Sequence, residues 1–169
     1  ALLKGEVKDS SVRFEASFAV QVLATGWSVI PFFPTEVGIE AIHFTMSASP
    51  ADTTTGVAGE SSQPASKPPL AQFIRDTKGY SLIARGPQSF TVTVVFHAPL
   101  QVAESTYTLS FLPPRSVINH LLLLIPEKGV NMLQTPPHRK ERQKEEATTV
   151  ETVLSEHDEL KLSWKIEKD

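Results

Sequence analysis

Histidine is the side chain best suited to proton transfer or metal binding near neutral pH, and this sequence scatters its histidines. No His-Glu-x-x-His motif occurs, and no two histidines stand at the spacing of a metal-binding pair. His43 and His97 fall at polar positions of alternating segments, so we expect both to face solvent from strands. The histidines are His43, His97, His120, His138 and His157.

Carboxylates gather in one place that suggests metal binding. Glu156, Asp158 and Glu159 follow one another closely, and hard cations such as calcium prefer oxygen ligands of this type. Their spacing is not that of an EF-hand loop, and a charged turn between two strands explains the same residues. The three acids are therefore weak calcium candidates, and the sequence indicates no other metal site.

Nucleophilic catalysis has little support in the sequence. Gly-x-Ser-x-Gly is absent, there is no cysteine, and the glycines match neither a phosphate-binding loop nor a dinucleotide fingerprint. Nothing singles out a pair of carboxylates for glycoside hydrolysis. We therefore predict a protein that is not an enzyme, with no catalytic residue and no cofactor.

Aromatic residues offer one further kind of chemistry, the stacking of a sugar ring. Trp27, Tyr80, Tyr107 and Trp164 are the large candidates, but most of them stand in or beside apolar alternation, where packing in a core is the commoner role. Trp27 and Tyr80 remain as candidate ligand-stacking residues.

Strands must position all of these residues. Apolar residues occupy every second position from Val12 to Leu23 and again from Gln88 to Ala98, the period of a strand with one buried face. Many short segments of this kind, separated by turn residues, predict an all-β fold with little helix. We expect a two-sheet antiparallel β-sandwich, immunoglobulin-like or jelly-roll-like, of about nine to eleven strands. The predicted core is Phe14, Phe18, Val20, Val22, Val92, Val94, Phe96, Leu109, Phe111, Leu121 and Leu123.

Two segments interrupt the strands of what we expect to be a single domain over residues 1–169. Residues 47–69 are rich in serine, proline and threonine and predict a flexible insertion. Residues 136–147 carry mixed charges and predict an exposed charged loop. Ala24, Thr25 and Gly26 predict a tight hairpin that returns the chain into a partner strand starting at Trp27.

The composition of the chain limits the classes of partner that it is expected to bind. A formal charge of -3 argues against nucleic acid, which selects a basic surface. The apolar run from Leu121 to Ile125 is far short of the roughly 20 residues of a membrane-spanning helix. We expect no membrane span within this chain, and partners that are other protein chains. Homo-oligomeric assembly through unpaired edge strands is one form of this, and a sugar ligand is the alternative.

Four stretches of this sequence, taken together, resemble regions of known proteins. LATGWSVIPFFP, ARGPQSFTVTVVFHAPL, STYTLSFLPPRSVINHLLLLIP and LKLSWKI resemble extracytoplasmic β-rich regions of large bacterial cell-envelope proteins. The resemblance implies a β-sandwich module located in the periplasm, in the envelope or outside the cell. Its expected role is non-enzymatic: structure, assembly or protein–protein interaction. The alternative is a carbohydrate-binding or ligand-sensing accessory ectodomain of a membrane receptor or channel.

Overall fold

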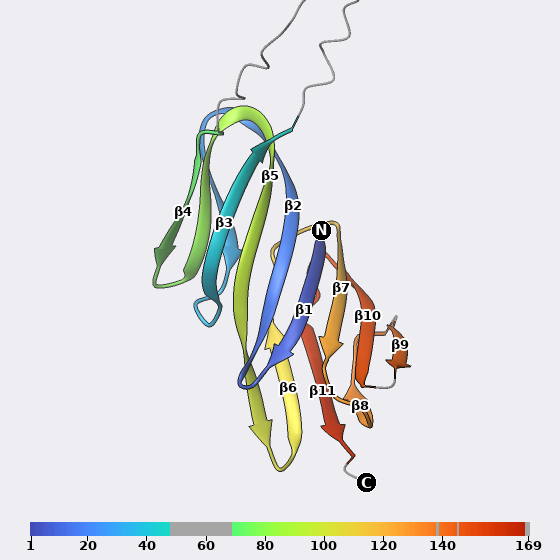
Figure 1. Ribbon diagram of the computed structural model, residues 1–169. Helices are drawn as coiled ribbons and strands as arrows, with labels where there is room; N and C mark the ends of the chain where they lie inside the picture. The colour runs from blue at the N-terminus through green and yellow to red at the C-terminus, as the bar shows by residue number, and fades with distance from the viewer. Residues whose placement is uncertain (48–68, 138, 145, 168–169) are drawn as a thin grey trace, which may run out of the picture.

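The computed structural model describes residues 1–47, 69–137, 139–144 and 146–167, and the regular structure of this part of the chain is entirely β-strand (Figure 1). The all-β prediction is thus confirmed, and the number of strands, eleven, lies within the expected range. The strands are β1 (Leu2–Lys8), β2 (Ser11–Phe33), β3 (Gly38–Met46), β4 (Ala71–Asp76), β5 (Gly79–Ala103), β6 (Thr106–Phe111), β7 (Ile118–Ile125), β8 (Val130–Gln134), β9 (Arg139–Lys144), β10 (Ala147–Ser155) and β11 (Leu160–Ile166).

A single curled sheet takes the place of the two separate antiparallel sheets that the sequence suggested. Its order is β8-β11-β6-β5-β2-β1-β7-β10-β9, with β3 and β4 also paired to β5. The sheet is mixed, because β1 runs antiparallel to β2 but parallel to β7. The expected two-sheet, all-antiparallel sandwich is therefore not what forms. The alternation of apolar residues defines a buried face without defining which strands are neighbours.

Strands β2 and β5 form one long antiparallel ribbon, which is the frame of the fold. Their register runs from Ser11 opposite Pro99 to Phe33 opposite Tyr80. Figure 1 shows this ribbon bent over at its upper end, between Val22 and Gly26 on β2, where the register shifts. We call this bend the arch. The hairpin expected at Ala24 to Gly26 is wrong, since the residues on both sides of it pair with β5 and not with each other.

Bending the ribbon brings its apolar face against itself. Even-numbered residues point inward on both arms of β2, so Phe18 on one arm meets Phe32 on the other with ring centroids 4.9 Å apart. Phe33, which follows a register shift on the same arm, packs on Phe96 of β5 with ring centroids 4.5 Å apart. The bent ribbon, with β3 and β4 at its flanks, therefore makes a two-layered body that we call the upper lobe.

The rest of the sheet curls into a half-barrel below the upper lobe. The two ends of the strand order approach each other, and Gln143 on β9 donates a hydrogen bond from Nε2 to the carbonyl of Val130 on β8 at 3.3 Å. Trp164 is fully buried in this region, with its ring stacked on Tyr107. Every residue of the predicted core is buried except Val20, which is only partly buried against the core.

The two interrupting segments have different outcomes. The predicted insertion at 47–69 lies almost entirely outside the described residues. The segment 136–147 was expected as a charged loop, but Arg139–Lys144 forms β9, an edge strand on β10 whose six residues are all exposed. Charged side chains on both faces give no period-two signal, so this strand was not recognisable. Lysine and arginine on an edge strand are a common defence against edge-to-edge aggregation.

The arch depends on a glycine that lets two backbones approach closely. A Cβ atom on Gly86 would lie 2.5 Å from Cγ1 of Val22 and would also overlap the carbonyl oxygen of Ala24. We expect Gly86→Ala to lower the free energy of unfolding by about 1–3 kcal/mol, the usual cost of overpacking. Gly38→Ala is the matched control, because its Cβ would meet nothing within 4 Å. Chemical denaturation of both variants measures the difference, and equal stabilities would contradict this account of the arch.

Candidate functional site

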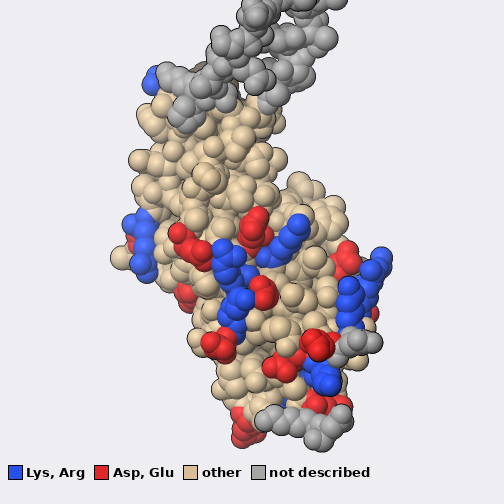
Figure 2. All heavy atoms as spheres, in the orientation of Figure 1, with Lys and Arg blue, Asp and Glu red and all other residues tan. Residues whose placement is uncertain are grey.

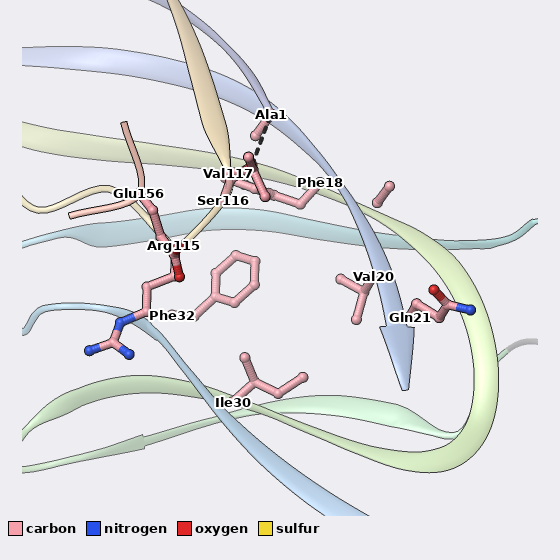
Figure 3. Close-up of a pocket in the computed structure, with 11 residues that line it drawn as sticks. Ala1, Phe18, Val20, Gln21, Ile30, Phe32, Arg115, Ser116, Val117 and Glu156 are labelled. Atoms are coloured by element: carbon pink, nitrogen blue, oxygen red, sulfur yellow. Dashed lines mark hydrogen bonds between the residues drawn. The ribbon is translucent and has the colours of Figure 1, made fainter. Parts of the chain in front are cut away.

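A hollow lies beside the edge of β2, below the arch. Its volume is about 400 Å³, a size that suits a small ligand or a few side chains. Figure 3 shows Val20, Ile30 and Phe32 directed into it from the two arms of β2. Four consecutive β2 residues line the hollow, from Phe18 to Gln21. Since side chains of a strand alternate between faces, four in a row mean that the backbone edge itself borders the cavity.

Two different strands pair with β2 along its length, and Ala1 beside the start of β1 also lines the cavity. β1 pairs with β2 only from Ser11 to Ser17, whereas β2 continues to Phe33. Over the remaining length the described strands pair with β2 on one side alone, through β5. Unpaired edges are the surfaces on which sheets add further strands.

A loop before β7 forms the opposite wall of the cavity. Arg115, Ser116 and Val117 line it, and Val117 is 81% exposed, the highest value among the large apolar residues of the described chain. The loop is held by Asn119, a buried residue whose Nδ2 donates to the carbonyl of Pro114 at 3.3 Å. Arg115 also lines a second, smaller hollow of about 230 Å³, so its guanidinium stands between two apolar depressions.

Sequence reasoning did not find Arg115, because Pro-Pro-Arg-Ser indicates only a rigid corner. The only signal in the sequence is a single arginine close to the apolar residue Val117. Within the described residues no ion pair involves Arg115. The cavity therefore combines an apolar floor with one unneutralised guanidinium, while Glu156 contributes a carboxylate at the rim.

A second polar arrangement lies on the outer face of the sheet. Arg13 on β2 binds Glu40 on β3 through two hydrogen bonds, of 3.0 and 3.1 Å. His97 on β5 contacts the same carboxylate through Nε2 at 2.8 Å, and its Nδ1 lies 3.4 Å from Oγ of Ser11. The bidentate pair holds the pKa of Glu40 at about 2, with the contact to His97 as the next cause. Sequence alternation had placed His97 on a solvent-facing strand position, and its side chain is 40% exposed.

The order of Ser11, His97 and Glu40 resembles that of a hydrolase triad, but its geometry does not favour nucleophilic chemistry. A base activates a serine from about 2.6–3.2 Å, and the serine–histidine distance here is longer. Arg13 competes for the carboxylate that would orient the imidazole. Arg13 lines a hollow of about 340 Å³ on this sheet face, but Ser11, His97 and Glu40 are not among the residues that line it. We interpret the group as a clamp that ties β2, β5 and β3 together.

The predicted calcium candidates do not converge. Oδ2 of Asp158 accepts a hydrogen bond from the amide of Ser155 at 2.8 Å, and Oε1 of Glu159 accepts one from Ser110 at 2.5 Å. Glu156 lines the cavity instead. Across the residues that the structure describes, no three histidine or acidic side chains form a group that could hold a metal ion.

The two candidate stacking residues are also separated. Trp27 is 61% exposed on the outer face of the upper lobe. Tyr80 is half-buried against the core, with the guanidinium of Arg75 5.5 Å from its ring centroid. Trp27 pairs with Arg85, so it lies five residues along β5 from Tyr80, about 17 Å at the usual rise of a strand. The structure therefore offers one exposed ring and no two-ring platform.

Charge is distributed unevenly over the molecule. In Figure 2 the lysine, arginine, aspartate and glutamate side chains gather on the lower part, while the described surface of the upper lobe is almost free of them on this face. The outer face of the upper lobe carries Val29, 63% exposed, beside Trp27. In the described part of the chain, no helix is long and apolar enough to cross a membrane.

Comparisons with known proteins give a likeness of fold alone. The sequence matches no protein-family model and no curated protein. Among solved structures, the chain is similar to an M1 zinc metallopeptidase mutant from Deinococcus radiodurans, crystallised with a Tyr-Ser-Ala substrate. The TM-score is 0.55 with 6% sequence identity over 97% of this chain, which spans 41% of the length of that peptidase.

The clamp predicts how the stability of the folded protein depends on pH. The pKa of Glu40 lies near 2 in the folded protein and near its ordinary value of 4.5 in the unfolded chain. The stabilisation from this carboxylate is therefore complete above pH 4.5 and is lost as the pH falls toward 2. Arg13→Ala should raise the pKa of Glu40 toward 4.5, and His97→Gln should raise it less. Carboxyl NMR titration measures both shifts.

Lys4→Ala is the control for this titration, because among the described residues the contacts of Glu40 are with Arg13 and His97 and not with Lys4. An unchanged pKa of Glu40 in Arg13→Ala would show that the clamp does not persist in solution.

Proposed function

We propose that this chain is a non-enzymatic module that binds other protein chains through an unpaired sheet edge. The observation that carries the proposal is the arm Gly26–Phe33 of β2, which pairs with β5 alone among the described strands and lines an apolar cavity with Ile30 and Phe32. An edge supplies backbone donors and acceptors to an extended segment, and a neighbouring apolar pocket supplies selectivity for its side chains.

Two further observations support this role. The solved peptidase of similar fold is more than twice as long as this chain. A fold of this kind can therefore form one part of a longer polypeptide. Within the described residues, the acidic side chains of the clamp and of the β10–β11 turn accept hydrogen bonds from the protein itself. A location outside the cytoplasm, in the envelope or periplasm, belongs to the same proposal and rests on the resemblance of the four sequence stretches.

Selection from a phage-displayed library of random linear peptides tests the proposal. We expect the immobilised protein to enrich peptides that bind again in solution with micromolar affinity, since a strand edge binds the backbone of an extended segment and the apolar pocket selects among its side chains. The control is the same selection on an unrelated β-domain of similar size. Failure to enrich any peptide above that control would contradict protein-segment recognition.

Exposed Trp27 favours one alternative, a carbohydrate-binding surface on the upper lobe. Tryptophan faces stack on sugar rings, and such a ring must be open to solvent as this one is. The alternative requires a single ring to suffice, because Tyr80 is not nearby.

Tryptophan fluorescence separates the two tryptophans. Trp27 is exposed and Trp164 is fully buried, so acrylamide should quench only one component of the emission, and Trp27→Phe should abolish that component. A glycan that protects Trp27 from acrylamide would support the carbohydrate alternative. Binding in a glycan array that persists unchanged in Trp27→Phe would exclude this ring as the site.

A further inference from the structure

The smaller hollow, of about 230 Å³, lies where the upper arm of β2 (Gly26–Phe33) ends. The greater part of its wall is apolar and consists of Pro31, Phe32, Phe33, Pro34, Leu112 and Pro113. The two remaining lining residues, Lys78 and Arg115, are both cations, and no acidic residue of the described chain lines it. We call it the cationic hollow.

Lys78 is placed beside the cationic hollow by the tight turn between β4 and β5. Gly79 has a φ of 134°, and a Cβ atom there would overlap the carbonyl oxygen of Phe33, so the turn packs directly against the end of the upper arm. Oδ1 of Asp76 accepts hydrogen bonds from the amides of Lys78 at 2.7 Å and Gly79 at 3.2 Å. This carboxylate therefore holds the backbone of the turn, and among the described residues it forms no ion pair with the ammonium of Lys78.

Arg115 reaches the cationic hollow from the segment between β6 and β7, directly after the buried residue Pro114. In Figure 3 its guanidinium points away from Val20 and Ile30, which line the larger cavity. Arg115 and Lys78 are both exposed, and neither forms an ion pair within the described part of the chain. Two cations without an acidic partner give this apolar hollow a positive potential.

The lining predicts a ligand that is both anionic and apolar. A carboxylate between the two cations would gain charge-assisted hydrogen bonds, and an apolar group beside it would cover Leu112, which is 51% exposed. Pockets for small ligands usually enclose about 300–1,000 Å³, and this hollow is smaller. Its size suits roughly one or two side chains, so a protein segment with an acidic residue next to an apolar one fits better than a free small molecule.

The cationic hollow also continues the edge of the upper arm. Pro31, Phe32 and Phe33 are the last residues of β2 and line the hollow. Proline has no amide hydrogen, so a strand added along this edge finds no backbone donor at Pro31. A segment that pairs with the arm before Pro31 therefore continues into a region where side chains, and not backbone hydrogen bonds, provide the contacts.

We propose that the cationic hollow binds an acidic residue and a neighbouring apolar residue of a partner protein, in a segment that otherwise lies along the upper arm of β2. Lys78 and Arg115 hold the carboxylate, while Leu112 and Pro113 contact the apolar side chain. This inference rests on the proposed function and adds the chemistry by which the partner segment is recognised.

Two capped peptides test the cationic hollow, Glu-Leu-Thr-Val-Thr-Val and Thr-Val-Thr-Val-Leu-Glu, which carry the acid at opposite ends of the segment. Each is titrated into isotopically labelled protein and followed by amide chemical shifts in NMR. We expect one of them to shift the amides of Phe33, Lys78, Leu112 and Arg115. It should bind about two- to fivefold more tightly than the same peptide with lysine in place of glutamate, the range of an exposed ion pair.

Reversal of both charges tests the two cations. Lys78→Glu combined with Arg115→Glu should weaken binding of the glutamate peptide about fivefold and favour the lysine peptide. Lys161→Glu combined with Arg142→Glu is the matched control, because the change in net charge is the same and both residues are exposed outside the hollow. Amide spectra verify that the variants fold, and Lys78→Gln with Arg115→Gln replaces the reversal if it unfolds the protein.

The outcomes separate the cationic hollow from the broader proposal. Equal affinities of the glutamate and lysine peptides, or equal effects of the two double variants, would overturn it. Phenylacetate that shifts the same amides with the affinity of the peptide would also overturn it, since a free carboxylate would then be the ligand. If library-selected peptides bind along the upper arm without a preference for acidic residues, the protein-binding function stands and the cationic hollow is wrong. If neither the designed nor any selected peptide binds, both proposals fail.

Discussion

Burial of the inner face of the β2–β5 ribbon is the constraint on which the rest of this structure depends. The ribbon is longer than any other pair in the sheet, and its inner face carries large apolar residues almost without interruption. A flat ribbon would leave one half of this face in water. Bending at the arch covers each arm with the other, as the contact of Phe18 with Phe32 shows, and leaves the lower arm to support the half-barrel. The free energy of burying apolar area thus accounts for the bend.

The same bend gives the upper arm of β2 a single partner. Among the described strands, Gly26–Phe33 pairs with β5 alone. Other edges of the sheet are defended by charge, as on β9, where all six side chains are exposed and most are charged. The edge of β2 instead faces an apolar cavity that Arg115 also lines. The difference between the charged edge of β9 and the apolar edge of β2 marks β2 as the surface suited to binding. The fold class does not mark it, because one fold can host many functions.

Sequence periodicity predicted an all-β chain, although not strand β9, and ten of the eleven residues assigned to the core are buried. Phe14, Val92, Val94 and Leu123 could be assigned to the interior because side chains alternate between faces in any strand, whatever its neighbours. The candidate sites were less accessible to this reasoning. Clustering in sequence suggested a metal site at Glu156, Asp158 and Glu159, but the structure turns their side chains to different partners. Neither Glu40 nor Arg115 belongs to a sequence motif or cluster that would mark it as part of a site.

Only the tertiary structure decided how the strands are arranged. Ala24, Thr25 and Gly26 are residues typical of a tight turn. Such residues can form either a hairpin or a bend within a pair of strands. The pairing with β5, which is distant in sequence, decides that a bend forms. β9 lacks an apolar face, so it exists as a strand only because β10 offers its edge. The cavity beside β2 depends on where the loop before β7 passes, which is set by long-range pairing. Local residue order fixes which face of a strand is buried, because that follows from backbone geometry alone. It does not fix the neighbours, because any two half-buried strands can pair and the choice is made by the packing of the whole core.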